Sequence, residues 1–220
     1  MKFPSAYKAV KKLFIAEILS IAVAVVGLVA AILAIVGVTN PDGSALITAG
    51  TLALVSALAM IAVFVLQLIA MIQGGRDADG FRSALWVTLI AIAVSITSGV
   101  LQSIEATKGL TILISVLNAF VDVAHVIVIF LVLTTIASLA SILKNETVAE
   151  KGRRLAFYVV IMFMASILLG LIPSFFNKVN VPEFVKVMFG IFGIVAVVIE
   201  LLIYINILVF YWRSLRTLKK

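Results

Sequence analysis

The sequence predicts an all-α integral membrane protein in which residues 1–220 form a single transmembrane domain of six spans. Four stretches of 24, 33, 22 and 23 residues carry no charge, and a helix needs about 20 apolar residues to cross the hydrocarbon core of a bilayer. Two more apolar runs are each interrupted by one acid, Asp122 or Glu200. The composition agrees with this class, because 64% of the residues are hydrophobic and only 12% are charged.

The first two spans are expected at 13–38 and 45–72, joined by a turn at Asn40-Pro41-Asp42-Gly43. The apolar run 13–38 follows a lysine-rich segment, as the core of a secretory signal does. It is 26 residues long, whereas a signal core has about 7–15, so we interpret it as a retained span. The preceding residues 3–12 are predicted to form a separate short helix that lies in the membrane interface.

The remaining spans are expected at 84–104, 110–143, 155–176 and 185–212. Short turns at 105–109 and 177–182 pair them, so that the chain forms three hairpins. Lys11, Arg82 and Arg153 begin the hairpins at a constant spacing of 71 residues. This spacing favours three parallel repeats around an axis along the membrane normal. The alternative is that bilayer thickness alone gives hairpins of similar length.

The basic residues predict the orientation. Fourteen of the 17 Lys and Arg residues lie in alternate loops or at the termini, on one side of the predicted bundle. By the positive-inside rule both termini are cytoplasmic, and we expect the protein in the plasma membrane of a bacterium. The basic residues behind the net charge of +7 are therefore interpreted as signals that set the topology, with some attraction to anionic lipid headgroups. No nucleic-acid partner is expected.

Polar side chains recur at helical intervals along one face of the third, fourth and sixth spans. They are Thr88, Ser95, Ser98 and Gln102 in the third, Ser115, Asn118, Asp122 and His125 in the fourth, and Glu200, Tyr204 and Tyr211 in the sixth. Because the short turn 105–109 joins the third and fourth spans, their polar faces can share one space. The sequence therefore predicts an outward-facing polar cavity lined by these three spans.

Asp122, His125 and Glu200 are the strongest candidates for a solute or ion site. An acid at the centre of a membrane costs about 3 kcal/mol by insertion scales and usually faces a bundle interior or water. The interval from Asp122 to His125 also suits two metal ligands on one helix face, with Glu200 as a third. A structural hydrogen-bond network is the alternative. Glu17, which lies close to Lys11 and Lys12, is interpreted as one partner of an interfacial ion pair.

Small residues predict close helix packing. They are Gly27 and Ala31 in the first span, Ala49, Ala53 and Ala57 in the second, and Gly190 and Gly193 in the sixth. No phosphate-binding loop or nucleophile signature accompanies them, and cysteine is absent. The sequence therefore favours a role without catalysis, and no cofactor is expected.

The sequence favours transport or capture of a small solute or ion. The alternative is a membrane accessory protein that holds a partner subunit or a second copy of itself. In its size, its six spans and its cytoplasmic termini, the chain resembles the S components of energy-coupling factor vitamin transporters, and its small-residue pairs Gly27-x-x-x-Ala31 and Ala30-x-x-x-Ala34 fit the docking of their first helix. That resemblance implies an outward-facing pocket and a first helix that docks on a partner.

Overall fold

The computed structural model describes residues 2–39, 44–103, 108–176 and 183–219. For 36–39, 108, 168–176, 183–194, 196–197 and 200 it describes the backbone alone. Within the described residues the chain forms six helices. They are α1 (Pro4–Thr39), α2 (Ser44–Gly74), α3 (Asp79–Gln102), α4 (Lys108–Ile142), α5 (Glu146–Phe176) and α6 (Glu183–Leu218).

Among the described residues, five of the helices contain stretches that are long and apolar enough to cross a membrane. These stretches are Pro4–Ile35, Ser44–Gly74, Asp79–Gln102, Gly109–Ile142 and Leu201–Leu218. Their outward surface is also apolar: Ile47 is 73% exposed, Ile35 70% and Ile112 66%. Aliphatic side chains spread over so much surface are unfavourable in water and suit contact with lipid. The all-helical class is confirmed, and the apolar helices are consistent with a multi-pass membrane protein.

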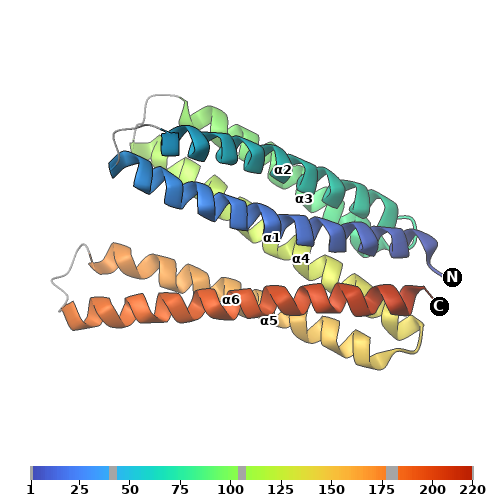
Figure 1. Cartoon of the computed structure of the whole chain (residues 1–220). Helices are drawn as coiled ribbons and strands as arrows, with labels where there is room; N and C mark the ends of the chain where they lie inside the picture. Colours follow the sequence, from blue (N-terminus) through green and yellow to red (C-terminus); the bar gives the residue numbers. More distant parts are fainter. Residues whose placement is uncertain (1, 40–43, 104–107, 177–182, 220) are drawn as a thin grey trace.

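The helices contact one another in the order of the chain. Each helix packs against the next, α6 closes the ring by contacting α1, and α4 also contacts α6. The contacts of α2 with α3, of α5 with α6 and of α1 with α6 are less extensive than those within the α1–α2 and α3–α4 pairs. The beginning of α1 and the end of α6 lie at the same end of the molecule (Figure 1); we call it the terminal end.

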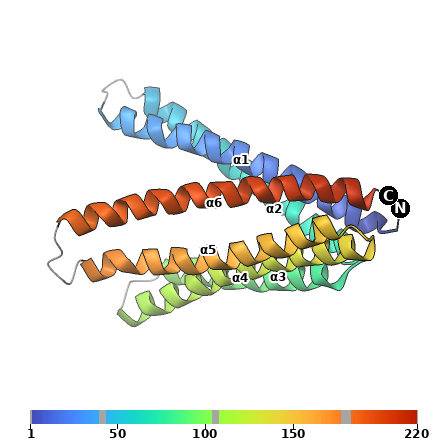
Figure 2. The ribbon, with the colours of Figure 1, turned by 90° about the horizontal axis from the view of Figure 1, so that it is seen from below.

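The described hydrophobic core is concentrated at the terminal end. Its largest fully enclosed side chains are Val10, Phe81, Leu133, Ile136, Phe210 and Leu218, which come from the parts of α1, α3, α4 and α6 nearest that end. Away from it, the α1–α2 pair diverges from α6 (Figure 2). The helices are therefore held together firmly at one end and separate toward the other.

Residues 3–12 do not form the separate interfacial helix that the sequence predicted. Helix α1 begins at Pro4 and continues unbroken to Thr39. Ala6, Ala9 and Val10 are all buried in the core, so packing holds this segment in line with the rest of the helix. The Asp77 carboxylate, from the turn between α2 and α3, accepts a 2.8 Å hydrogen bond from the backbone N–H of Ala6. This bond satisfies one of the free amides at the helix start.

The turn between α4 and α5 shows how the sequence ends one helix and begins the next. Lys144 adopts a positive φ of 57°, and the backbone N–H of Asn145 donates to the carbonyl of Ala140 at 2.9 Å. These are the features of a Schellman helix end. The Asn145 side chain then accepts from the N–H of Val148 at 3.4 Å and donates to Thr217 Oγ1 at 2.9 Å. One asparagine therefore caps α5 and ties it to α6.

The small residues predicted to pack helices together differ in how far they are buried. Ala49 is buried, whereas Ala31, Ala53 and Ala57 are exposed, and a Cβ added to Gly27 would meet no atom within 4 Å. Within the described chain, Gly27, Ala31, Ala53 and Ala57 therefore leave an open face, and their role in helix packing stays a prediction. The surroundings of Gly190 and Gly193 lie outside the described residues.

Candidate functional site

A cavity of about 490 Å³ lies between five helices, just beyond the core of the terminal end. Its described lining is Leu13, Glu17 and Ser20 of α1; Met60, Val63, Phe64, Gln67 and Met71 of α2; Thr88, Ala91, Ile92 and Ser95 of α3; Val121, Ala124, His125, Val128, Ile129 and Val132 of α4; and Tyr204 and Tyr211 of α6. Twelve of these twenty side chains are apolar. The volume is in the range of small-molecule sites, about 300–1,000 Å³.

Glu17 is the acidic residue in this lining. The Tyr204 hydroxyl of α6 donates a hydrogen bond to the Glu17 carboxylate and lies 3.4 Å from the Glu17 carbonyl oxygen. Glu17 is 13 residues beyond the start of α1 at Pro4, or about 20 Å along a helix that rises 1.5 Å per residue. Tyr204 is 14 residues before the end of α6 at Leu218. The two side chains therefore meet at one level, well inside the bundle.

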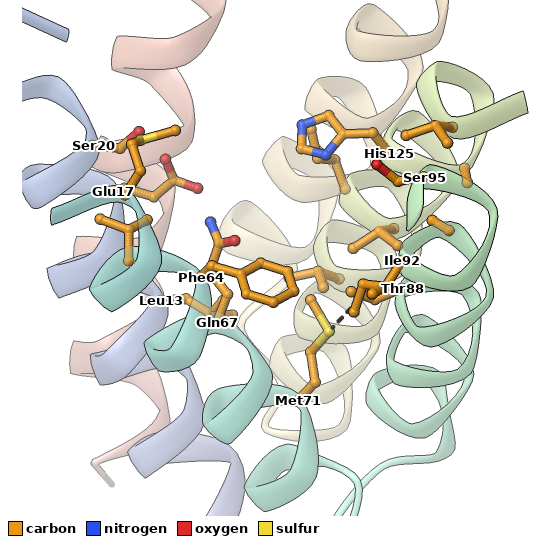
Figure 3. A pocket seen from close by; sticks show the side chains of 18 of the residues that line it. Leu13, Glu17, Ser20, Phe64, Gln67, Met71, Thr88, Ile92, Ser95 and His125 are labelled. Atoms are coloured by element: carbon orange, nitrogen blue, oxygen red, sulfur yellow. Dashed lines mark hydrogen bonds between the residues drawn. The ribbon is translucent and has the colours of Figure 1, made fainter. Parts of the chain in front are cut away.

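The opposite wall carries a histidine and two hydroxyl groups. In Figure 3, His125, Ser95 and Thr88 lie across the cavity from Glu17 and Gln67. Thr88 Oγ1 donates to its own helix at the Ala84 carbonyl, 2.8 Å away, and lies 3.5 Å from the sulfur of Met71. The cavity thus has an acid and an amide on the α1–α2 side and a titratable imidazole on the α3–α4 side.

Aromatic side chains of α1 and α6 pack against each other near the cavity. Phe14 and Trp212 pack with ring centroids 5.7 Å apart, nearer the terminal end than the Glu17–Tyr204 pair. The Arg216 guanidinium lies 5.2 Å from the centroid of the Trp212 ring, a cation–π contact. These pairs and the Glu17–Tyr204 hydrogen bond are side-chain contacts that join α1 to α6 near the cavity.

The predicted meeting of the polar faces of α3 and α4 is present, but it lies beyond the cavity. Ser98 is buried and donates a 2.8 Å hydrogen bond to the Asn118 side chain. Gln102 lies 3.5 Å from the Ser98 hydroxyl. Ser115 donates to the Thr111 carbonyl of its own helix at 2.9 Å. None of these four site candidates lines the 490 Å³ cavity.

The three residues that the sequence predicted as a solute or ion site, Asp122, His125 and Glu200, are not shown together at the cavity. Asp122 and His125, one turn apart, both have exposed side chains, but His125 lines the cavity and Asp122 does not. The side chain of Glu200 lies outside the described residues. Within the described parts of the chain, no three His, Asp or Glu side chains gather as a metal site would require. The predicted site of Asp122, His125 and Glu200 therefore stays a prediction.

Glu17 is the principal site residue that the sequence reasoning missed. The predicted ion pair assumed that Glu17 lies at the membrane boundary, because the span was taken to begin at Leu13. Since α1 is continuous from Pro4 and its first turns are buried, Glu17 lies inside the helix bundle, beyond packed turns of α1, and not at the end of its helix. Lys12 donates instead to the Gln73 side chain at 3.0 Å. The signal available in the sequence was Ser20, which follows Glu17 on the same helix face.

The sequence matches no family model, no curated protein and no solved structure. The resemblance to vitamin-transporter S components thus remains an expectation drawn from size, span number, cytoplasmic termini and small-residue spacing. The cavity and its side chains carry the functional argument.

Proposed function

We propose that this protein binds a small organic cation in the cavity and moves it across the membrane, with the Glu17 carboxylate as the anchoring anion. The observation that carries the proposal is a carboxylate inside the bundle that lines a 490 Å³ cavity and is held by Tyr204. An acid in such a position is costly, and it is functional by default.

The size and lining of the cavity favour an organic solute over a bare metal ion. Hard cations are held by several oxygen ligands at about 2.0–2.6 Å, and the described lining offers one carboxylate among mainly aliphatic walls. Aliphatic walls stabilise apolar carbon by about 0.8 kcal/mol for each buried methylene. A ligand with an apolar body and one charged group fits both features.

The charge of the described lining favours a cation over an anion. Glu17 faces the cavity, while lysine and arginine are absent from its described lining. Phe64 and Tyr204 add aromatic rings, whose faces attract ammonium groups by about 0.5–2 kcal/mol. An ammonium ion next to Glu17 competes with the Tyr204 hydroxyl for the carboxylate. Binding is therefore coupled to the contact between α1 and α6.

A graded series of ammonium ions tests the proposal. Binding of ammonium, tetramethylammonium and benzyltrimethylammonium is measured by equilibrium dialysis with the purified full chain, and uptake of the radiolabelled ions is measured in proteoliposomes. Affinity is expected to rise about fourfold for each additional buried methylene. Glu17→Gln keeps the volume and hydrogen-bonding capacity but removes the charge, so it should weaken binding at least about tenfold and abolish uptake.

Glu146→Gln is the matched control, because it makes the same chemical change at an exposed residue at the start of α5. It should bind and transport as the parent does. Asp122→Asn removes the charge of the acid that the sequence favoured. Because Asp122 does not line the cavity, this variant should also retain binding. Equal affinity in the parent and in Glu17→Gln would refute the proposal, as would a parent that binds none of the ions.

The same proposal includes the finer topology. Six spans in three hairpins, with both termini cytoplasmic, agree with the location of 14 of the 17 basic residues. In this orientation the core of the terminal end closes the cavity toward the cytoplasm, and the diverging ends of the helices face outward. The sixth span is α5, whose apolar segment begins at Leu155.

The accessory role is the second candidate, and one observation favours it. Gly27 in α1 faces open space, since an added Cβ would meet no atom within 4 Å, and Ala31 one turn further on is exposed. Such a face allows a helix of another subunit to approach closely. Gly27→Leu should then reduce co-purification of that subunit or of a second copy. Unchanged assembly together with cation uptake would leave transport by the single chain as the function.

A further inference from the structure

A second cavity, of about 380 Å³, lies between α5 and α6 at the terminal end and is separate from the Glu17 cavity. We call it the basic groove. It is lined by Thr147, Glu150, Lys151, Arg154, Leu155, Tyr158, Ile203, Asn206 and Arg213. Three of these side chains are cationic and one is anionic, so the groove carries two positive charges in excess.

The charges are grouped at one end of the groove. Arg154 is paired with Glu150 on its own helix, whereas Lys151 faces the positive charge of Arg213. This neighbouring charge and partial burial both lower the pKa of Lys151 from its ordinary value, burial being the larger cause. Two cations held side by side repel each other, and an anion between them removes the repulsion.

The other end of the groove is uncharged and lies nearer the middle of the bundle; its one amide, Asn206, donates to the Leu202 carbonyl of its own helix at 2.9 Å. Leu155 and Tyr158 continue along α5, and Ile203 lies ten residues before Arg213 on α6, or about 15 Å along the helix. Leu155 is also the first residue of the apolar segment of α5. The groove therefore runs from charged groups at the membrane boundary to hydrocarbon within it.

We propose that the basic groove binds an anionic phospholipid, with its phosphate between Lys151 and Arg213 and an acyl chain along Tyr158 and Ile203. The chemistry is that of phosphate recognition by a basic pocket between membrane helices. A free phosphate ion would use the charged end alone. The apolar continuation into the membrane favours the lipid as the source of the phosphate.

Native mass spectrometry of the detergent-purified full chain tests this site. Phosphatidylglycerol and phosphatidylcholine with the same acyl chains are titrated in parallel, and only the anionic lipid should bind tightly. Each basic side chain near a membrane surface contributes about 1 kcal/mol to attraction of anionic lipid. The double variant Lys151→Gln/Arg213→Gln should therefore weaken phosphatidylglycerol binding about 30-fold.

A matched double variant, Arg153→Gln/Lys219→Gln, removes the same charge from exposed residues at the same end but outside the groove. It should bind phosphatidylglycerol as the parent does, and Lys151→Arg should also retain binding, which shows that charge rather than folding is responsible. Equal losses in the two double variants would overturn the proposal, because diffuse surface charge would then explain the binding. Equal affinity for the two lipids, or displacement of the lipid by millimolar inorganic phosphate, would overturn it as well.

Discussion

Replacement of Gly152 by alanine tests the packing that holds the terminal end together. Gly152 is buried in α5, where α4 and α6 approach it closely. An added Cβ would lie 2.6 Å from Cζ of Phe210 and 2.8 Å from Cβ of Ala137. Carbon atoms in contact prefer a separation of about 3.5–4.0 Å, so the neighbours would have to move by about 1 Å.

The expected loss of stability follows from two opposing terms. Overpacking of a filled core costs about 1–3 kcal/mol, whereas alanine in place of glycine favours a helix by about 0.8–1.0 kcal/mol. Phe210 is fully buried, so its ring can move only by displacing other core side chains, which places the packing cost toward the upper end. The net destabilisation should be about 1–2 kcal/mol.

Thermal unfolding in detergent measures this change. At about 2–4 °C for each kcal/mol in a chain of this length, Gly152→Ala should unfold several degrees below the parent. Gly27→Ala is the matched control, because its Cβ meets open space, and it should be at least as stable as the parent. Adding Phe210→Leu to Gly152→Ala should cost less than it does in the parent. A Gly152→Ala protein as stable as the parent would refute the described packing of α4, α5 and α6.

Three further predictions concern other parts of the chain. Asp77→Ala removes the acceptor at the start of α1 and should cost about 1 kcal/mol; hydrogen exchange of the first-turn amides should speed up, and unchanged protection would argue against the cap. Ser98→Ala should lower stability by only about 0.6 kcal/mol, the mean for polar contacts between membrane helices, and a loss several times larger would show that the bond to α4 is part of a larger network. A cysteine at the exposed residue Ser44 should react with a membrane-impermeant thiol reagent added to intact cells, whereas a cysteine at the exposed residue Glu146 should react only after the cells are opened. The reverse pattern would invert the proposed orientation.

The positions of the helices could be predicted from the sequence, because each uncharged stretch has about the length that a helix needs to cross a bilayer. Contacts between helices adjacent in the chain follow as well, because only a few residues separate the end of α3 at Gln102 from the start of α4 at Lys108, and the two helices must lie side by side. The hydrogen bond between Ser98 and Asn118 is the direct result, and both residues were predicted to share a space. Periodicity within one helix and a short loop together fix such a contact.

The cavity could not be predicted in the same way, because it depends on contacts between helices far apart in the chain. Tyr204 reaches Glu17 across 187 positions of sequence, and no periodicity in α1 or α6 shows that these helices are neighbours. The depth of Glu17 depended on whether α1 begins at Pro4 or at Leu13, which burial of Ala6, Ala9 and Val10 decides. Asp122 failed to reach the cavity for a related reason, since the rotation of α4 is set by its packing against α3 and α5.

Carbodiimide labelling tests most directly whether the Glu17 carboxylate lies in an accessible cavity where an organic cation binds. The reconstituted full chain is treated with the apolar reagent dicyclohexylcarbodiimide, with or without benzyltrimethylammonium chloride, and sodium chloride at the same ionic strength is the control. Modification of Glu17 and of the exposed Glu146 is measured by peptide mass spectrometry. Glu17 should be modified, and the organic cation alone should protect it while Glu146 is unaffected. An unmodified Glu17, or modification that the organic cation does not reduce, would contradict the proposed site.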